Sequence, residues 1–341
     1  MGEAFSPKER LHRALNKKPV DRPPVICPGG MMNAAIVEVM QKTGNELPRA
    51  HHSGELMAAL AYDVHRATGF ENFGIPFCMT VEAEALGSEV DYGSLKCEPK
   101  IAKEVFGSVK DVRCLSSGII QNTKRAGAVF ASVYELSKKH PDIPVTGSIA
   151  GPLSTTASLI DPMTFLKELR REKDEAHRVL NYVTDRLIEY AKIIADSGAD
   201  IIGIADPTAT GEILGPKLFE EYALTYINKL AGAIHELGIP VIVHICGELR
   251  MVKAHLPRLR GDALSVDAFV NLRELKKETG VPVTMGNLST YMLEFGTPEK
   301  IYRAARGLLK NDIDILAPAC GLSTSTPLEH ITGFTQAVQK T

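Results

Sequence analysis

One histidine and two cysteines carry the clearest chemical signal in the sequence. The run HICG (244–247) ends one apolar stretch, and Cys320 ends another far downstream. Residues i and i+2 of a strand point to the same face, so His244 and Cys246 can bind one ion. Three nitrogen and sulfur ligands leave one zinc position open for a substrate, whereas structural zinc is closed by four protein ligands. A core histidine with two buried thiols is the alternative interpretation.

Acidic and amide side chains end three other apolar runs. Asp206 and Asp267 each end one, and Asn287 ends a third. Asp267 is predicted to be a fourth zinc ligand or to orient His244, with a helix cap or a loop salt bridge as the alternative. Asp206 and Asn287 are candidates for binding substrate, although a turn would also use an asparagine.

The remaining polar pairs and cysteines are predicted to be structural. Cys27, Cys97 and Cys114 have no partner spacing, so we expect them to be buried core thiols. Glu82 and Glu84 straddle one alanine, and such a pair usually marks a solvated helix face.

Short apolar runs alternate with longer amphipathic stretches along most of the chain. Runs that are apolar throughout are typical of parallel strands buried on both faces. Eight strands are predicted, at residues 23–28, 69–77, 143–151, 199–207, 239–247, 263–269, 281–288 and 314–322. Eight βα units predict an α/β fold of the (β/α)8 TIM-barrel type, with its catalytic groups at the carboxyl ends of the strands. A doubly wound open sheet is the alternative, but no glycine-rich nucleotide motif follows the first strand.

The domain organisation follows from this inventory. We expect one domain over residues 1–341, with an N-terminal extension at 1–22 that contains a helix capped by Ser6. Residues 78–140 are the least regular segment and are predicted to be an insertion after the second strand. It should contain short strands and a helix near 121–139.

Composition excludes several classes of function. The 341 residues are 44% hydrophobic and 23% charged, as in a globular protein. Lys plus Arg number 39 against 41 Asp plus Glu, and this net charge of -2 argues against nucleic-acid or anionic-membrane partners. No run of about 18 apolar residues could span a bilayer. The first residues lack the apolar core of a signal peptide, so we expect a cytoplasmic protein.

Over nearly its whole length the sequence resembles the uroporphyrinogen decarboxylase superfamily, beginning with ERLHRALNKKPVDRPPV. The decarboxylases continue with an arginine-rich clamp for a substrate that carries many carboxylates. Here the segment reads CPGGMMN, with Gly29 and Asn33 where the two arginines would stand. Cys78 takes the place of the decarboxylases' catalytic aspartate. The resemblance therefore argues against a decarboxylase and makes Asn33 and Cys78 candidates for binding another substrate.

The departures resemble the methyltransferase branch, the methylcobalamin:coenzyme M methyltransferases and their relatives. The shared features are H-x-C-G with a distant Cys-Gly, PFCMTVEAEALG, and DPTAT after the fourth predicted strand. The resemblance implies that His244, Cys246 and Cys320 bind zinc. It also implies that Asp267 matches an acidic residue that can complete the site.

The implied reaction moves a methyl group from a methyl-Co(III) corrinoid to a zinc-activated thiol, with coenzyme M as the leading acceptor. No D-x-H-x-x-G corrinoid signature occurs, so the cobalt should arrive on a partner protein or as free methylcobalamin. We expect a corrinoid protein to dock at the barrel mouth, around residues 28–33, 78–95 and 206–216.

Three alternatives stay open. The enzyme could load methyl from methanol, a methylamine or an aryl methyl ether onto Co(I), or it could pass methyl to tetrahydrofolate. A non-catalytic, zinc-stabilised subunit of a corrinoid complex is the alternative of another class. A decarboxylase is the weakest enzyme hypothesis.

Overall fold

The computed structural model describes residues 4–281 and 283–339, and its centre is a curved parallel sheet. Parts of the expectations for residues 1–22, 281–288 and 1–341 fall on residues 1–3, 282 and 340–341, which lie outside the described residues. Seven strands pair in the order β1-β4-β5-β6-β7-β8-β9. Their bounds are β1 Phe73–Ile75, β4 Val145–Ala150, β5 Ile201–Ala205, β6 Val241–Ile245, β7 Ala263–Val266, β8 Thr284–Leu288 and β9 Ile315–Pro318.

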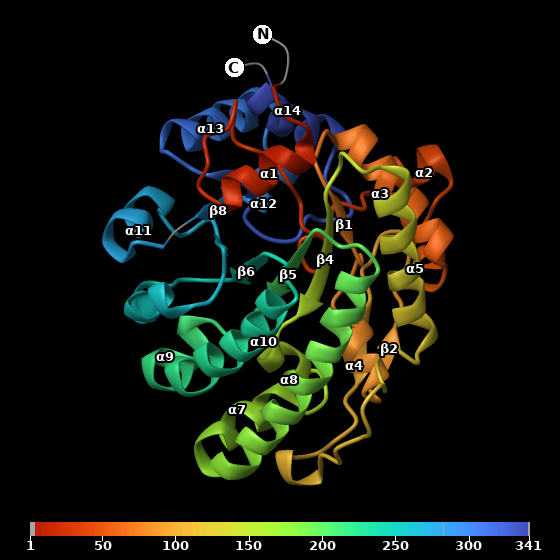
Figure 1. Ribbon diagram of the computed structural model, residues 1–341, viewed down its shortest axis with the longest axis vertical. Coiled ribbons are helices and arrows are strands. Elements are labelled where there is room, and N and C mark those ends of the chain that lie inside the picture. The colour runs from red at the N-terminus through yellow and green to blue at the C-terminus, as the bar shows by residue number, and fades with distance from the viewer. Residues whose placement is uncertain (1–3, 282, 340–341) are drawn as a thin grey trace.

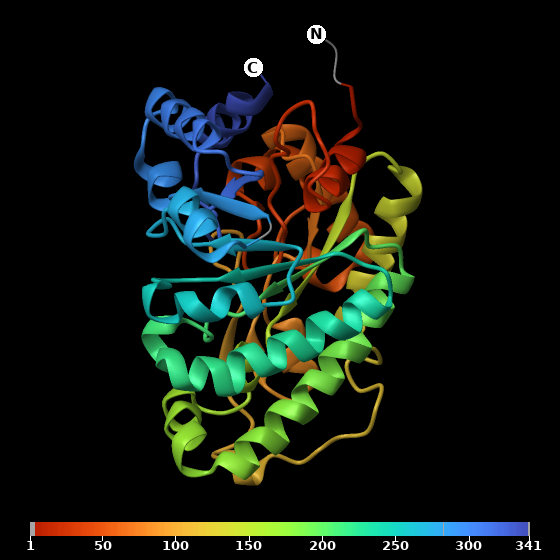
Figure 2. The same ribbon diagram turned by 60° about the vertical axis from the view of Figure 1, so that its left-hand side comes forward.

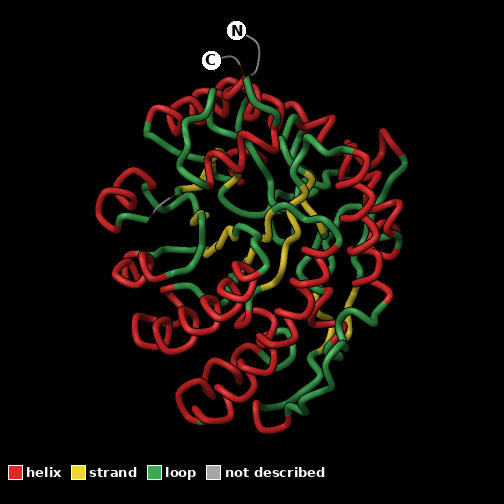
Figure 3. Tube along the Cα trace, viewed as in Figure 1, coloured by secondary structure: helices red, strands yellow, loops and turns green. Residues whose placement is uncertain are grey.

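Helices surround this sheet, which lies at the centre of the molecule (Figures 1 and 3). Their bounds are α1 Pro7–Leu15, α2 Val37–Thr43, α3 Gly54–Thr68, α4 Val81–Ala85, α5 Lys124–Lys139, α6 Pro152–Ala157, α7 Pro162–Arg171, α8 Lys173–Asp196, α9 Gly211–Leu218, α10 Thr225–Glu236, α11 Leu272–Thr279, α12 Thr290–Phe295, α13 Pro298–Lys310 and α14 Leu328–Gln339. Figure 2 shows α8 and α10 side by side along the outside of the sheet. The fold is of the TIM-barrel type, as the strand inventory predicted.

The first predicted strand, residues 23–28, is not a regular strand, which corrects the count of eight. It forms a single parallel bridge, between Val25 and Leu316 of β9. The segment contains three prolines, which have no N–H to donate to a sheet. Instead, Glu71 Oε2 accepts the N–H of Val25 at 3.0 Å, and the Glu71 N–H donates to the Val25 carbonyl at 2.8 Å. The segment therefore bridges β9 and the start of β1 without a regular ladder.

The region around the second predicted strand also differs from expectation. The strand spans only Phe73–Ile75, because Pro76 follows it and cannot continue the ladder. The segment 78–140 contains an antiparallel hairpin, β2 Glu89–Asp91 with β3 Lys100–Lys103, as its predicted short strands required. It also contains α5, which packs against α3, α8, β1 and β4 and so belongs to the helical layer around the barrel.

Helix α1 closes the amino-terminal end of the barrel. Its N-cap is Ser6, whose Oγ accepts the N–H of Glu9 at 3.2 Å, as predicted. Its apolar face forms one cluster with side chains inside the barrel: Leu11, Ala14 and Leu15 with Ile26, Met32, Ile201, Ile242, Ala263, Val283, Met285, Ile315 and Ala317. With this end filled, the carboxyl ends of the strands form the open mouth.

Candidate active site

The inward face of β6 leads directly to the mouth of the barrel. Ile242 packs in the interior cluster with α1, whereas Val243 and Ile245 pack in the larger cluster that includes the surrounding helices. Strand alternation therefore turns Ile242, His244 and Cys246 toward the barrel axis. The first of these fills the interior, and the other two reach the mouth.

The structure brings together the three residues that the sequence analysis proposed as metal ligands. The donor atoms of His244, Cys246 and Cys320 all lie within 4.8 Å of one another. His244 Nε2 lies 3.2 Å from Cys246 Sγ, which lies 3.8 Å from Cys320 Sγ. One imidazole and two thiols are the soft donor set that zinc accepts, and three donors leave a fourth position open.

A serine on the neighbouring strand orients the histidine. Ser265 pairs with His244 across β6 and β7, and its Oγ lies 2.9 Å from His244 Nδ1. Because Nδ1 has this partner, Nε2 is the nitrogen left to face the sulfur atoms. The sequence pattern did not single out Ser265, although it lies two residues before Asp267 and so on the same face of its strand.

A hydrogen bond joins the two sulfur atoms. Their mutual hydrogen bond lowers the pKa of the Cys320 thiol and raises that of Cys246. The nearby charges of Asp267 and Asp206 also raise the pKa of Cys246. The lowered pKa of the Cys320 thiol favours its thiolate form, which is the form that binds a metal ion.

Asp267 and Asn287 hold the loops of the mouth. Asp267 Oδ2 accepts the N–H of Gly247 at 3.2 Å, and Oδ1 accepts the N–H of Ala268 at 2.6 Å. Gly247 has a φ of 75°, a left-handed conformation that favours glycine. Asn287 Nδ2 donates to the carbonyls of Asp267 and Val270, both at 2.7 Å. Among the described residues, the cluster of metal donors does not include Asp267.

Asp206 is fully buried and caps a short helix. It accepts the N–H groups of Leu153 and Ser154 at 3.0 and 2.9 Å, and the Ser154 hydroxyl at 2.6 Å. Burial raises the pKa of Asp206 to about 6, against the lowering effect of these hydrogen bonds. Both oxygens thus bind the first turn of α6, the alternative that the sequence analysis weighed for Asp267.

Asn33 connects the mouth to the β2–β3 hairpin. Its Nδ2 donates to Glu98 Oε1 at 2.8 Å, and its Oδ1 accepts the N–H of Ala35 at 3.1 Å. Partial burial raises the pKa of Glu98, and the nearby charge of Cys320 adds to this effect. No sequence pattern pointed to Glu98, because only the folded hairpin brings it near Cys320.

Cys78 belongs to a buried polar cluster. Its Sγ lies 2.9 Å from Arg125 Nη2, and the same guanidinium forms an ion pair with Glu84. The prediction of a solvated face is wrong for Glu82, which is only 1% exposed. Glu82 Oε1 accepts the N–H of Ala150 at the end of β4, and burial raises the pKa of Glu82 to about 7. Helix α4 turns this carboxyl inward against the barrel.

The prediction of three core thiols also needs correction. Cys27 is buried, but Cys97 and Cys114 are exposed. Cys97 lies at the tip of the β2–β3 hairpin, where no second layer covers it. Apolar character alone did not reveal that these two cysteines lie in surface segments.

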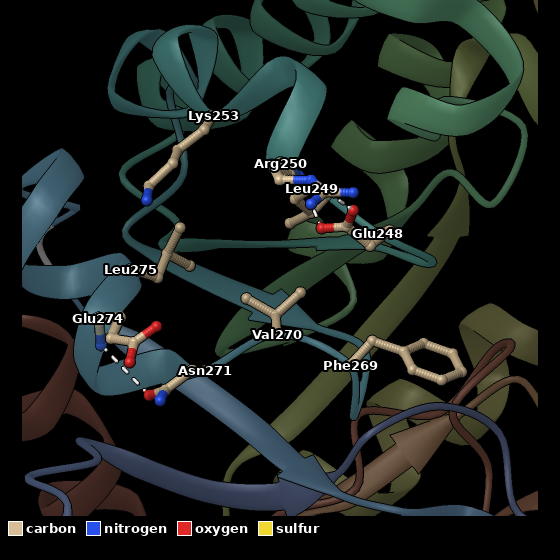
Figure 4. A pocket seen from close by; sticks show the side chains of 9 residues that line it. All are labelled: Glu248, Leu249, Arg250, Lys253, Phe269, Val270, Asn271, Glu274 and Leu275. Atoms are coloured by element: carbon tan, nitrogen blue, oxygen red, sulfur yellow. Dashed lines mark hydrogen bonds and ion pairs between the residues drawn. The ribbon is translucent and has the colours of Figure 1, made fainter.

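A cavity of about 210 Å³ lies between the loops that follow β6 and β7 (Figure 4). Asn271 Oδ1 accepts the N–H of Glu274 there and caps α11. Phe269 points away from the other labelled side chains and is 80% exposed. The residues that line this cavity are Glu248, Leu249, Arg250, Lys253, Phe269, Val270, Asn271, Glu274 and Leu275. None of these is one of the three candidate metal ligands.

Comparison with known proteins identifies the family. The family model described as uroporphyrinogen decarboxylase (URO-D) matches residues 6–341. The chain belongs to this family. Within it, the chain is 34% identical to the methylcobamide:CoM methyltransferase MtbA of Methanosarcina acetivorans over 325 residues, which are 95% of this chain and 94% of that protein. It is 31% identical to the methylcobamide:CoM methyltransferase MtaA of Methanosarcina barkeri, over 98% of this chain and 97% of that protein.

A solved structure of a methyltransferase from Methanosarcina mazei has the same architecture. It superposes with a TM-score of 0.92 at 29% identity, covering 98% of this chain and 99% of that one. The relatives and this structure show that this member of the uroporphyrinogen decarboxylase family is a methyltransferase.

The structure does not accommodate an arginine at Gly29, one of the two positions where the resemblance places the decarboxylases' arginines. Gly29 has a φ of 90°, and a Cβ there would lie 2.4 Å from the backbone of Gly74 in β1. An arginine at this position would therefore collide with the sheet.

Among residues 4–281 and 283–339, the structure contains no helix long and apolar enough to cross a membrane.

Proposed function

We propose that this protein is a zinc-dependent methyltransferase that moves a methyl group from a methyl-Co(III) corrinoid to a thiol, with coenzyme M as the leading acceptor. One observation carries the proposal: three soft donors converge at the mouth of the barrel, within 4.8 Å of one another. The names of the relatives support the choice of substrates, since MtbA and MtaA are methylcobamide:CoM methyltransferases.

The chain provides a site that fits zinc. His244 Nε2, Cys246 Sγ and Cys320 Sγ would hold the ion, and Ser265 keeps the imidazole in the orientation this requires. When bound, zinc would lower the pKa of an acceptor thiol, so that the thiol is present as thiolate at neutral pH. Asp267 holds Gly247 and with it the turn that follows Cys246.

The proposed reaction balances without a further reactant. The acceptor thiolate attacks the methyl carbon, an S–CH3 bond forms, and the Co–CH3 bond breaks. The electron pair of the Co–CH3 bond stays on the cobalt, so the products are a methyl thioether and a Co(I) corrinoid. The proton of the acceptor thiol leaves when the thiol binds as thiolate.

A corrinoid protein would have to cover the mouth, because the acceptor sulfur lies at the metal ligands. Residues 28–33, one of the expected docking segments, are almost all buried and offer little surface. The structure instead exposes large apolar side chains on the segments that follow β6, β7 and β8, two of them on α12. They are Met251, Phe269, Tyr291 and Phe295, which are 59%, 80%, 73% and 65% exposed. We therefore assign the docking surface to these four residues.

Metal analysis and a methyl-transfer assay test the proposal together. We expect about one zinc per chain, and loss of zinc in Cys246→Ala and Cys320→Ala because each removes one ligand. Cys114→Ala is the matched control, since this cysteine is exposed and lies outside the cluster. Full zinc retention in both ligand variants would contradict the site.

The assay follows methylcobalamin absorbance with coenzyme M, homocysteine and tetrahydrofolate in parallel. Turnover with coenzyme M supports the leading acceptor. Turnover with tetrahydrofolate alone would show that the alternative acceptor is correct. The absence of turnover with every thiol would reject thiol methylation.

A further inference from the structure

The serine that contacts His244 has a second partner, on the opposite side of its hydroxyl group. Ser265 Oγ lies 2.9 Å from His244 Nδ1 and donates to the sulfur of Met32 at 3.7 Å. Among the residues that the structure describes, these are the two hydrogen-bond contacts of the Ser265 hydroxyl. Ser265 is 0% and Met32 1% exposed, so bulk water does not compete for either contact. The three side chains therefore connect the interior of the barrel to the candidate metal ligands.

A tight turn in the segment 28–33 fixes the position of Met32. The N–H of Gly29 donates to the Met32 carbonyl, and the Met32 N–H donates to the Gly29 carbonyl, both at 3.0 Å. Cys27 Sγ also donates to the Met32 carbonyl, at 2.7 Å. Gly29 and Gly30 have φ values of 90° and 60°, a left-handed conformation that favours glycine. Because the Met32 backbone is held at both polar groups and its side chain packs in the interior cluster, its sulfur has a fixed position.

The direction of these hydrogen bonds determines which nitrogen of His244 has a free lone pair. The Ser265 hydroxyl has one hydrogen, and the thioether sulfur of Met32 can only accept it. When this hydrogen points to the sulfur, the oxygen offers Nδ1 only lone pairs, so Nδ1 carries the proton of the neutral imidazole. Nε2 is then unprotonated, as a metal ligand must be, and faces Cys246 Sγ at 3.2 Å. Without an acceptor at residue 32, the hydroxyl is free to donate to Nδ1, which would place the proton on Nε2.

We propose that Met32 is a positioning residue for the metal site, whose sulfur acts through Ser265 to fix the zinc-binding tautomer of His244. The inference rests on the proposed function, because zinc is the ion that would use the unprotonated nitrogen. The competing explanation is that Met32 only fills space in the barrel. Met285 offers the comparison, since it is buried in the same interior cluster, and among the described residues its sulfur receives no hydrogen bond.

Zinc affinities of single and double variants test this role, measured by competition with a chromophoric chelator. Substituting a residue that hydrogen-bonds a metal-ligating histidine typically lowers metal affinity about 10- to 100-fold. We expect Ser265→Ala to raise the Kd for zinc about tenfold, and Met32→Leu about fivefold because it keeps the serine oxygen. In the Ser265→Ala background, Met32→Leu should cause no further loss, since the hydroxyl through which the sulfur acts is gone. Met285→Leu is the matched control and should bind zinc as the wild type does.

NMR of the zinc-free protein, labelled with 15N in its histidines, measures the tautomer directly. At about pH 8 an imidazole is ordinarily neutral, and the His244 signals are those that are missing from His244→Gln. The wild type and Met285→Leu should have the proton on Nδ1. Met32→Leu should show a population with the proton on Nε2, a change that a loss of packing alone would not produce.

Three results would each overturn the role of Met32. They are an unchanged tautomer and zinc affinity in Met32→Leu, an equal loss of affinity in Met285→Leu, and a loss that persists in the Ser265→Ala background. If the tautomer and the zinc affinity depend on Met32 as expected but the zinc-loaded wild type transfers no methyl group, the proposed function fails and the role of Met32 stands.

Discussion

At the scale of single residues, the mouth of the barrel separates metal ligands from the groups that hold them. The donor atoms of His244, Cys246 and Cys320 lie close together. Asp267 and Asn287 form hydrogen bonds to backbone groups of the loops around them. Substituting either of these two would therefore disturb the ligands through the backbone.

The buried carboxyl of Glu82 gives a prediction about pH. Burial raises its pKa from 4.5 to about 7, so the native state keeps a proton that the unfolded chain has lost between these values. Its contribution to the free energy of unfolding is fully present below pH 4.5 and is lost as pH rises through about 7. In Glu82→Gln this loss is absent. When the pH rises from 5 to 8, the free energy of unfolding of the variant should therefore increase by about 2 kcal/mol relative to that of the wild type.

Urea unfolding of both proteins at pH 5 and pH 8 measures this change. Glu55→Gln, at an exposed glutamate, is the control and should show the same pH dependence as wild type. An unchanged difference between Glu82→Gln and wild type at the two pH values would show that the carboxyl does not titrate in this range.

At the scale of elements, the hairpin of β2 and β3 is the part of the mouth that does not come from a barrel strand. Its tip closes on itself, with the Ser94 N–H donating to the Cys97 carbonyl at 2.8 Å and the Cys97 N–H to the Ser94 carbonyl at 3.2 Å. Thr324 and Asn33 then fasten the tip to the mouth. These few side-chain bonds determine how firmly the hairpin tip is held at the mouth.

Thr324→Val removes the hydroxyl that binds the Lys96 carbonyl and should loosen the hairpin tip. A lost hydrogen bond of this kind costs about 1 kcal/mol, so amide protection across residues 93–99 should fall about fivefold. Hydrogen exchange read by mass spectrometry measures this change. Thr332→Val is the control, because its hydroxyl also binds a backbone carbonyl, that of Glu329 in α14. Unchanged exchange at the hairpin would show that Thr324 does not hold it.

Different elements were predictable to different degrees. The strand that carries His244 and Cys246 is a continuous apolar run, and its period of two correctly assigned both side chains to the inward face. The segment 23–28 has the same apolar character, but its prolines leave backbone groups for side chains to satisfy. Glu98 comes near Cys320 only through the fold of the hairpin, and no local pattern encodes that approach.

At the scale of the whole molecule, the two ends of the barrel differ in what they expose. Leu11 and Leu15 of α1 fill the amino-terminal end and are buried. Large exposed apolar side chains lie at the mouth, on the segments that follow β6, β7 and β8. A partner that must reach the metal ligands therefore meets exposed apolar side chains at the mouth.

Phe269→Ser tests this surface with two methyl donors. Loss of a central aromatic contact typically costs 1 to 2 kcal/mol, so the KM for a methylated corrinoid protein should rise about tenfold. The KM for free methylcobalamin should stay the same, because the free donor needs no protein contact on the rim. Tyr134→Ser is the control, since this tyrosine is 58% exposed on α5. An equal rise for both donors would place Phe269 in the binding of the corrinoid itself, and no rise for either would remove it from the docking surface.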